Sequence, residues 1–169
     1  LWQLSQGIDE RKVVSERQAK SISNETTFAH DISDRVALHT RLMELTEQVA
    51  SRLRHAGLMG RTVNLKLRFA DFKTLSRSLS LEKPTQTTEV LWQTVSQLFK
   101  QCNLLQPVRL IGMGVSNLVH ENERVEEQAE LFATIDPRQQ QLDELADTIN
   151  NRFGKATLHR GSSTRRTTD

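Results

Sequence analysis

The segment 61–69 alternates between apolar and polar side chains at every residue, and this alternation constrains the fold more than any other feature of the chain. One parity holds Val63, Leu65, Leu67 and Phe69, and the other holds Thr62, Asn64, Lys66 and Arg68. Successive side chains of a β-strand point to opposite faces of the sheet. The segment is therefore predicted to be a strand with one face in the core and one face in water.

A second strand is predicted directly after the first, over residues 74–81. Its apolar residues of one parity are Leu75, Leu79 and Leu81. The link 70–73 is short enough to favour an antiparallel hairpin, and Pro84 is expected to end the second strand. Arg77 has the parity of the leucines. Either a bulge shifts it to the other face, or it lies at a sheet edge with its guanidinium reaching water.

Two helices are predicted from apolar residues that recur at steps of three and four, one over 33–56 and one over about 88–102. These residues are Leu38, Leu42, Leu45, Val49, Leu53 and Ala56 in the first helix, and Leu91, Val95, Leu98, Phe99 and Cys102 in the second. Ser33 is expected to cap the first helix by accepting a hydrogen bond from a first-turn amide. Gly57 is expected to end it.

Two further segments complete a sheet. Residues 20–29 are rich in Ser and Thr, and residues 107–118 alternate between larger apolar and small side chains. The resulting order is β-α-β-β-α-β, an α+β fold in which a four-stranded sheet offers one face to both helices. The opposite face stays open, and we expect Ser, Thr, Asn, Lys, Arg and Gly to line it.

Several classes of protein are excluded by simple features. The single cysteine, Cys102, rules out an internal disulfide and is expected to be an inert core residue. No apolar run approaches the roughly 20 residues of a membrane span. The N-terminus has no signal-peptide pattern, so the expected compartment is the cytoplasm. The chain begins without Met, and we expect it to be part of a longer protein.

No catalytic or metal-binding residue is predicted. The five histidines show no ligand spacing with Cys102 or with one another. The pair Asp9-Glu10 follows Gly7 in a polar linker, whereas a metal ion would need carboxylates on a rigid, buried strand. The chain has no Gly-rich nucleotide loop. We therefore expect no cofactor in this chain.

Charge is distributed unevenly along the chain. Residues 15–120 hold 14 Lys/Arg and 9 Asp/Glu, a net charge of +5, whereas residues 121–169 hold 7 and 10, a net charge of −3. A basic body suits a polyanion, and hydroxyls, basic groups and glycines on the open face suit a phosphate backbone. No aromatic residue is predicted on that face, which argues against base stacking. The alternative is an ordinary sheet face in water.

Four stretches, in this order and at this spacing, resemble the C-terminal region of Y-family DNA polymerases of the DNA polymerase IV type. They are 1–9 (LWQLSQGID), 20–28 (KSISNETTF, family pattern KSxSxExTF), 63–74 (VNLKLRFADFKT) with 76–78 (SRS), and 108–118 (VRLIGMGVSNL). The resemblance implies that residues 1–19 are the end of the thumb domain and a linker. It implies that residues 20–120 are the little-finger domain, which binds primer–template DNA during translesion synthesis past DNA damage.

The resemblance also implies which residues contact double-stranded DNA, and that they do so largely through phosphates. These residues are Lys20, Ser21, Ser23, Thr27, Lys66, Arg68, Thr74, Arg77, Ser78, Arg109, Gly112 and Ser116. In the family, nucleotidyl transfer uses Mg²⁺ held by carboxylates of the palm domain. Because no palm is recognised in this chain, it is expected not to polymerise DNA alone. We expect it to be a monomer.

A partner is implied by a short peptide within residues 121–136, an acidic segment expected to be mobile. The run from Gln128 to Phe132 (QAELF) resembles the sliding-clamp-binding pattern QLxLF, with Ala129 in place of the usual Leu. Leu131 and Phe132 would fill an apolar pocket of the clamp, and Gln128 would set the register.

The remaining segments form a tail, and their role is left open. Residues 137–160 contain a predicted helix that begins at Asp136-Pro137 and ends at Gly154. Its apolar stripe consists of Leu142, Leu145, Ala146, Ile149 and Phe153. Residues 161–169 are expected to be disordered.

Three functions remain open from the sequence. The first is a DNA-binding module of an error-prone translesion polymerase, which predicts affinity for duplex DNA that ignores sequence and falls steeply with salt. The second is a stand-alone interaction or accessory domain, for example a clamp-binding one, without polymerase activity. The third is an enzyme in its own right, for which the sequence shows no site.

Overall fold

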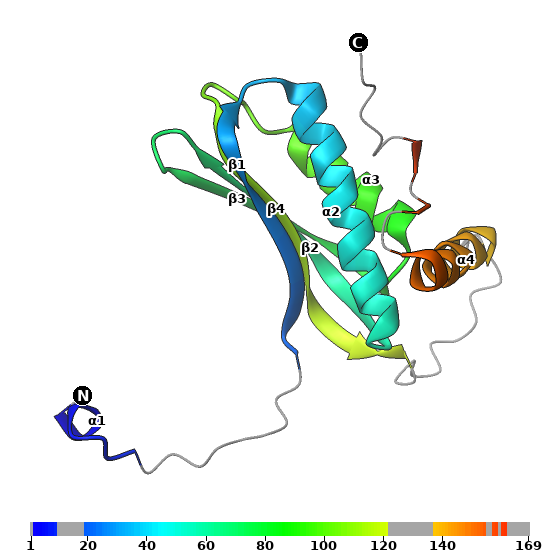
Figure 1. Ribbon diagram of the computed structural model, residues 1–169, viewed down its shortest axis with the longest axis horizontal. Coiled ribbons are helices and arrows are strands. Elements are labelled where there is room, and N and C mark those ends of the chain that lie inside the picture. The colour runs from blue at the N-terminus through cyan, green and yellow to red at the C-terminus, as the bar shows by residue number, and fades with distance from the viewer. Residues whose placement is uncertain (1, 10–18, 122–136, 155–156, 159, 162–169) are drawn as a thin grey trace.

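The structure is a computed structural model, and it describes residues 2–9, 19–121, 137–154, 157–158 and 160–161. Its elements are α1 (Trp2–Ser5), β1 (Ser21–Ile32), α2 (Arg35–His55), β2 (Leu58–Phe69), β3 (Thr74–Thr85), α3 (Thr88–Lys100), β4 (Val108–His120) and α4 (Pro137–Phe153), as Figure 1 shows. From β1 to β4 the order is β-α-β-β-α-β, as predicted. No helix in the described part of the chain is long and apolar enough to cross a membrane.

The four strands form one antiparallel sheet with the order β1-β4-β2-β3. The last strand, β4, therefore lies between β1 and β2, and the edges of the sheet are β1 and β3. Helices α2 and α3 lie side by side on one face of the sheet, and α4 lies on the outer side of this helix pair (Figure 1). The predicted α+β fold is confirmed, and no helix of the described residues covers the second face of the sheet.

The core lies between the sheet and helices α2 and α3, and its side chains follow the predicted periodicities except at Ala56 and Leu79, which are exposed. Buried side chains from the helices include Leu38, Leu42, Leu45, Val49, Leu53, Leu91 and Val95, and those from the strands include Val63, Leu65, Leu67, Ile111, Met113 and Val115. Each such side chain contributes about 1.5–3 kcal/mol to stability when it is fully buried. This interface therefore decides which face of the sheet is left open.

Two element ends differ from the prediction. Helix α2 begins after Asp34, and Asp34 rather than Ser33 is its cap: the Asp34 carboxylate accepts a 2.8 Å hydrogen bond from the Val36 N–H. A carboxylate there also matches the positive end of the helix dipole. Strand β1 continues to Ile32, past an irregularity in its pairing with β4. Gly57 ends α2 as predicted, with a φ of 61°.

Pro84 does not end β3, contrary to the prediction. The strand runs on to Thr85. Its register with β2 shifts so that the four residues 81–84 of β3 stand opposite a single residue of β2. A proline is tolerated there because β3 is an edge strand, and a bulged residue need not donate a ladder hydrogen bond.

Arg77 lies on the helix side of the sheet, at its edge. The pairing of β2 with β3 is uninterrupted around it, and Arg77 stands opposite Leu65, so no bulge moves it. Its side chain is exposed, which agrees with the second of the two predicted alternatives. Burial raises the pKa of the nearby Cys102 thiol, and the positive charge of Arg77 opposes that rise.

Helix α4 forms as predicted, and it packs on the body through polar side chains. Asp143 and Asp147 form ion pairs with Arg54 of α2. The exposed residues of the predicted apolar stripe are Leu142, Leu145 and Phe153. The expected start at Asp136 lies outside the described residues, as does the predicted disordered tail apart from Gly161.

Candidate nucleic-acid interface

Sixteen residues, four from each strand, pair in regular rows on the side of the sheet that faces away from the helices, and we call this set the open face. They fall into four rows that cross β1, β4, β2 and β3 in that order. The rows are Ser21, Ser116, Thr62 and Ser80; Ser23, Gly114, Asn64 and Ser78; Glu25, Gly112, Lys66 and Ser76; and Thr27, Leu110, Arg68 and Thr74.

Hydroxyl groups dominate the open face, because nine of its sixteen residues are Ser or Thr. Some of them already bond to one another or to an amide. Thr62 Oγ1 and Ser80 Oγ lie 2.9 Å apart, and Asn64 Nδ2 donates to Ser116 Oγ at 3.1 Å. A hydroxyl that accepts from a neighbour can still donate to a phosphate oxygen. The face is therefore suited to contact a nucleic-acid backbone.

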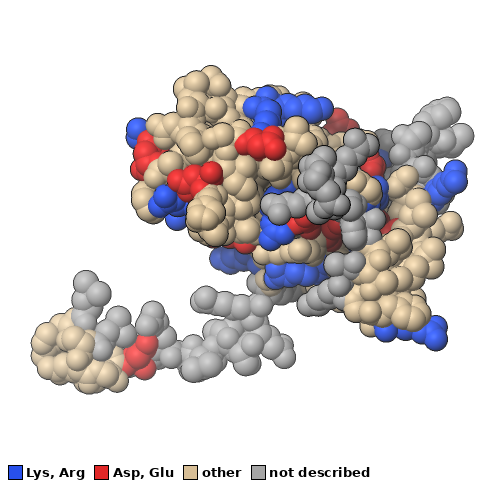
Figure 2. Space-filling view, turned by 45° about the horizontal axis from the view of Figure 1, so that its top comes forward, with Lys and Arg blue, Asp and Glu red and all other residues tan. Residues whose placement is uncertain are grey.

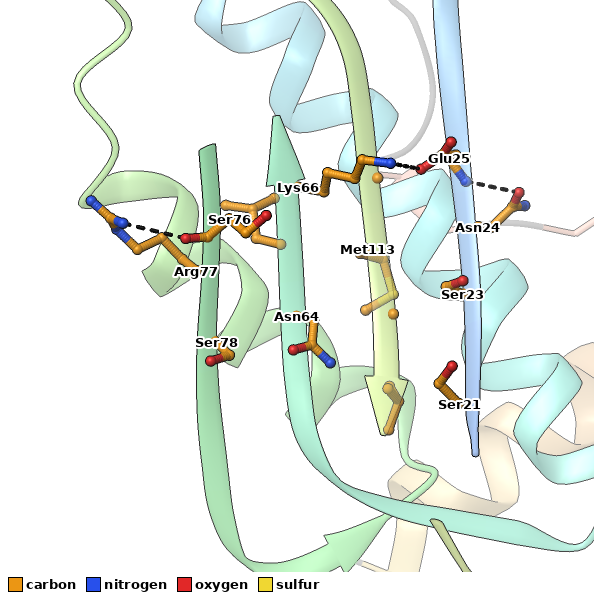
Figure 3. Close-up of a pocket in the computed structure, with 14 residues that line it drawn as sticks. Ser21, Ser23, Asn24, Glu25, Asn64, Lys66, Ser76, Arg77, Ser78 and Met113 are labelled. Atoms are coloured by element: carbon orange, nitrogen blue, oxygen red, sulfur yellow. Dashed lines mark hydrogen bonds and ion pairs between the residues drawn. The ribbon is translucent and has the colours of Figure 1, made fainter. Parts of the chain in front are cut away.

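The open face is hollowed over its middle rows. The hollow has a volume of about 420 Å³ and takes residues from all four strands (Figure 3). Gly112 and Gly114 have no side chain to fill it. A Cβ at Gly112 would lie 2.7 Å from Glu25 Cβ, and a Cβ at Gly114 would lie 2.7 Å from Ser23 Cβ. The close packing of β1 against β4 thus requires glycine at both positions. This requirement holds whether or not a phosphate approaches the hollow.

Two cations lie on the open face, Lys66 and Arg68, and both are on β2. Arg68 Nε donates to Thr74 Oγ1 at 3.2 Å, and Lys66 Nζ lies 2.8 Å from Glu25 Oε2. Basic and acidic side chains are also interspersed on the side of the molecule seen in Figure 2. The open face therefore offers many neutral hydrogen-bonding groups and little net charge.

The structure brings nine of the twelve predicted DNA contacts together on the open face. They are Ser21, Ser23, Thr27, Lys66, Arg68, Thr74, Ser78, Gly112 and Ser116. Lys20 is exposed and directly precedes β1, next to the first row. The other two, Arg77 and Arg109, are not among the sixteen residues, although Arg77 also lines the hollow. In Figure 3 the side chain of Arg77 extends away from Lys66, beyond β3.

Arg109 lies at an irregularity in the pairing of β4 with β2, and its charge is compensated within the domain. Its guanidinium forms a two-pronged ion pair with Asp31, with Nε–Oδ1 and Nη2–Oδ2 distances of 3.0 Å. It also lies 4.5 Å from the centre of the Phe72 ring. The hydrogen bond from Arg109 lowers the pKa of the Asp31 carboxyl below its usual value.

Seven residues of the open face are absent from the predicted contacts. They are Thr62, Asn64, Ser76, Ser80, Glu25, Gly114 and Leu110. Strand parity could have found most of them, because Thr62 and Asn64 share the parity of Lys66, and Glu25 shares that of Ser23. Strand parity could not have predicted the ion pair of Glu25 with Lys66, because this pair depends on the order of the strands in the sheet.

No group of three or more His, Cys, Asp or Glu in the described part of the chain could hold a metal ion. His39 lies between α2 and α3, with Nε2 2.8 Å from Ser96 Oγ and its ring centre 4.5 Å from that of Trp92. Burial lowers the pKa of His39, and the charges of Lys100 and Arg35 lower it further. A neutral imidazole packed on an aromatic ring is a structural part of the helix layer.

Known proteins match most of this chain. A family model described as impB/mucB/samB family C-terminal domain matches residues 19–131. DNA polymerase IV of Streptomyces coelicolor is 42% identical over 118 residues, which make up 70% of this chain and 25% of that protein. DNA polymerase IV of Dehalococcoides mccartyi strain CBDB1 is 35% identical over 164 residues, which make up 94% of this chain and 40% of that protein.

A solved structure shares the fold. It is described as a complex of beta-clamp processivity factor and little finger domain of PolIV. The similarity has a TM-score of 0.50 at 23% sequence identity, and it covers 66% of this chain and 98% of that chain.

The four-stranded sheet, with two helices on one face and a hydroxyl-rich face opposite, defines a little-finger domain. The chain belongs to the impB/mucB/samB family and contains its C-terminal domain. It is similar to the C-terminal, little-finger region of Y-family DNA polymerases of the DNA polymerase IV type. It spans between a quarter and two fifths of the length of the two relatives.

Proposed function

We propose that this chain is the DNA-binding little-finger part of an error-prone translesion DNA polymerase, and that it holds primer–template duplex through backbone phosphates. The proposal rests on the open face, because its four rows bring nine hydroxyls and two cations together on one hollowed surface. Contacts of this kind position a duplex without reading its sequence. This suits a polymerase that must follow any template, including a damaged one.

The composition of the open face favours a duplex over unpaired bases. Proteins that bind single strands stack the bases on aromatic side chains. The sixteen residues of the open face include no aromatic one. Hydroxyl donors together with Lys66 and Arg68 match phosphates that lie along a regular backbone.

The nucleotidyl-transfer chemistry is proposed to lie outside this chain. Such chemistry uses metal ions such as Mg²⁺, which clustered carboxylates hold between the attacking and leaving oxygens. The described residues contain no such cluster. Asp9 is exposed, and Glu10 lies outside the described residues. The chain alone is proposed to bind DNA without polymerising it, as a monomer in the cytoplasm.

A sliding clamp is the second proposed partner, bound by Gln128, Leu131 and Phe132. These residues lie outside the described part of the chain. The proposal rests on their likeness to the pattern QLxLF and on the fold shared with a little-finger domain solved together with a beta-clamp. A Leu131→Ala/Phe132→Ala variant should lose clamp binding and keep its affinity for duplex DNA. A stand-alone accessory domain would bind the clamp and no DNA.

Arg68→Glu and Arg77→Glu form a matched pair that tests the DNA-binding proposal. Both reverse one charge on neighbouring strands, but Arg68 belongs to the open face and Arg77 to the opposite side. Fluorescence anisotropy of a labelled primer–template duplex would be measured at about 50 and 200 mM salt. With about two charged phosphate contacts, the affinity of the unmodified chain should fall roughly tenfold between these conditions.

The two variants should then differ. Arg68→Glu should weaken binding strongly, whereas Arg77→Glu should weaken it much less. An equal loss in both variants would contradict the open face as the binding surface. Absence of binding by the unmodified chain at the lower salt concentration would refute DNA binding and leave the clamp as the remaining proposed partner.

A further inference from the structure

One ion pair of the open face spans a whole strand. Glu25 on β1, Gly112 on β4 and Lys66 on β2 stand side by side in the third row. Neighbouring strands lie about 4.8 Å apart, so β1 and β2 are roughly 10 Å apart here. Lys66 Nζ nevertheless reaches to 2.8 Å from Glu25 Oε2. It can do so because Gly112 places no side chain between them, and Figure 3 shows Lys66 extended over β4.

The Glu25 carboxylate offsets one of the two positive charges of the open face. The sixteen residues include two cations, Lys66 and Arg68, and one carboxylate, Glu25, which leaves a net charge of +1. Among the described residues, Arg68 has no carboxylate partner, and its Nε donates a hydrogen bond to the Thr74 hydroxyl. Lys66 is thus the cation of this face whose charge is already matched by a carboxylate.

The pair is open to solvent and therefore to a competing anion. The side chains of Lys66 and Glu25 are 38% and 51% exposed. An ion pair in water is weak, because water and salt screen it. A duplex phosphate that approaches the third row meets the Lys66 ammonium and the Glu25 carboxylate together, so the phosphate and the carboxylate compete for the same positive charge.

We propose that Glu25 is an internal competitor for the phosphate that Lys66 binds, and that it sets an upper limit on the affinity of the open face for DNA. This inference rests on the proposed function. Lys66 exchanges between Glu25 and a backbone phosphate, while Glu25 repels phosphates from the β1 side of the hollow. The backbone is thereby directed toward β2 and β3, where Lys66, Arg68 and five hydroxyl residues stand. A limited affinity lets the domain release and rebind DNA as synthesis advances.

Glu25→Gln tests this inference, because it keeps the shape of the side chain and removes its charge. Because an exposed ion pair is weak, its removal should tighten duplex binding roughly twofold to fivefold at about 100 mM salt, and it should steepen the salt dependence by at most about 0.9 in the logarithmic slope. The matched control is Glu44→Gln. Glu44 pairs with Arg41 on α2, on the other side of the sheet, so its neutralisation should leave DNA affinity unchanged.

A double-mutant cycle separates the exchange from general repulsion. If Glu25 acts by holding Lys66, then Glu25→Gln should have little effect in a Lys66→Gln background. An equal gain in DNA affinity from Glu25→Gln in the unmodified and the Lys66→Gln backgrounds would overturn the proposed exchange of Lys66 between Glu25 and a phosphate. Binding by the unmodified chain with no gain in Glu25→Gln would overturn this inference and leave the proposed function intact. Absence of DNA binding in all variants would refute both.

Discussion

The carboxylate of Asp143 on α4 accepts a 2.8 Å hydrogen bond from the backbone N–H of Thr88, the first residue of α3. The cap residue of α3, Thr87, makes no side-chain hydrogen bond to its own helix. The tail helix thus supplies the acceptor that the first turn of α3 lacks. Asp143 is only 5% exposed, and Arg54 and Arg160 also bond to its two oxygens.

Asp143→Asn should loosen α4 from the body. The amide has no charge to offset two guanidiniums, and one of its two polar atoms is a donor that would face them. Loss of these charged hydrogen bonds should cost about 1–3 kcal/mol of docking free energy. Native-state amide hydrogen exchange should show faster exchange in α4 and the first turn of α3. The exchange rates of β2 and β4 should stay unchanged.

Glu144→Gln provides the control for that substitution. Glu144 is the exposed neighbour of Asp143 on α4, so its neutralisation should change exchange little. Equal protection of α4 in both variants would show that its packing does not depend on the Asp143 carboxylate.

Docking of α4 should also weaken in acid, because Asp147 pairs with Arg54. Burial raises the pKa of Asp147, but the hydrogen bond and charge of Arg54 outweigh it, and the pKa lies below its usual value. A carboxyl with a lower pKa in the folded state adds stability above its unfolded pKa, and that stability is lost as pH falls through the folded pKa. Docking should therefore hold from pH 7 to about 4.5 and weaken below about 4.

NMR chemical shifts of α4 followed from pH 7 to about 2 would measure this transition. Asp147→Asn should abolish the part of the transition that comes from this carboxyl. A midpoint at or above the ordinary aspartate pKa would contradict the assigned role of Arg54.

Gly112→Ala should destabilise the sheet and disturb the open face. The new Cβ would stand 2.7 Å from Glu25 Cβ, and β1 could avoid the collision only by moving away from β4. Overpacking of this kind costs about 1–3 kcal/mol, which denaturant unfolding would detect. Gly161→Ala is the control, because a Cβ there meets nothing within 4 Å. Equal stability of the two variants would mean that β1 shifts without cost.

Local patterns were sufficient to predict the elements and their buried sides. The alternation of Val63, Leu65 and Leu67 with polar residues identified the buried side of β2, because strand geometry assigns sides by parity alone. The same parity placed Arg77 with the leucines of β3, where the structure has it. Element ends were less certain, since Ser33 and Asp34 are adjacent residues that can both cap a helix.

The sequence by itself determined the order of elements, the core and the polar character of the open face, because these depend on residue spacing within each segment. Tertiary structure alone decided which distant residues meet. Only the strand order β1-β4-β2-β3 brings Glu25 across Gly112 to Lys66. Only the packing of α4 brings Asp143 to Thr88. Such pairs depend on how separate segments pack together, and no local periodicity encodes that packing.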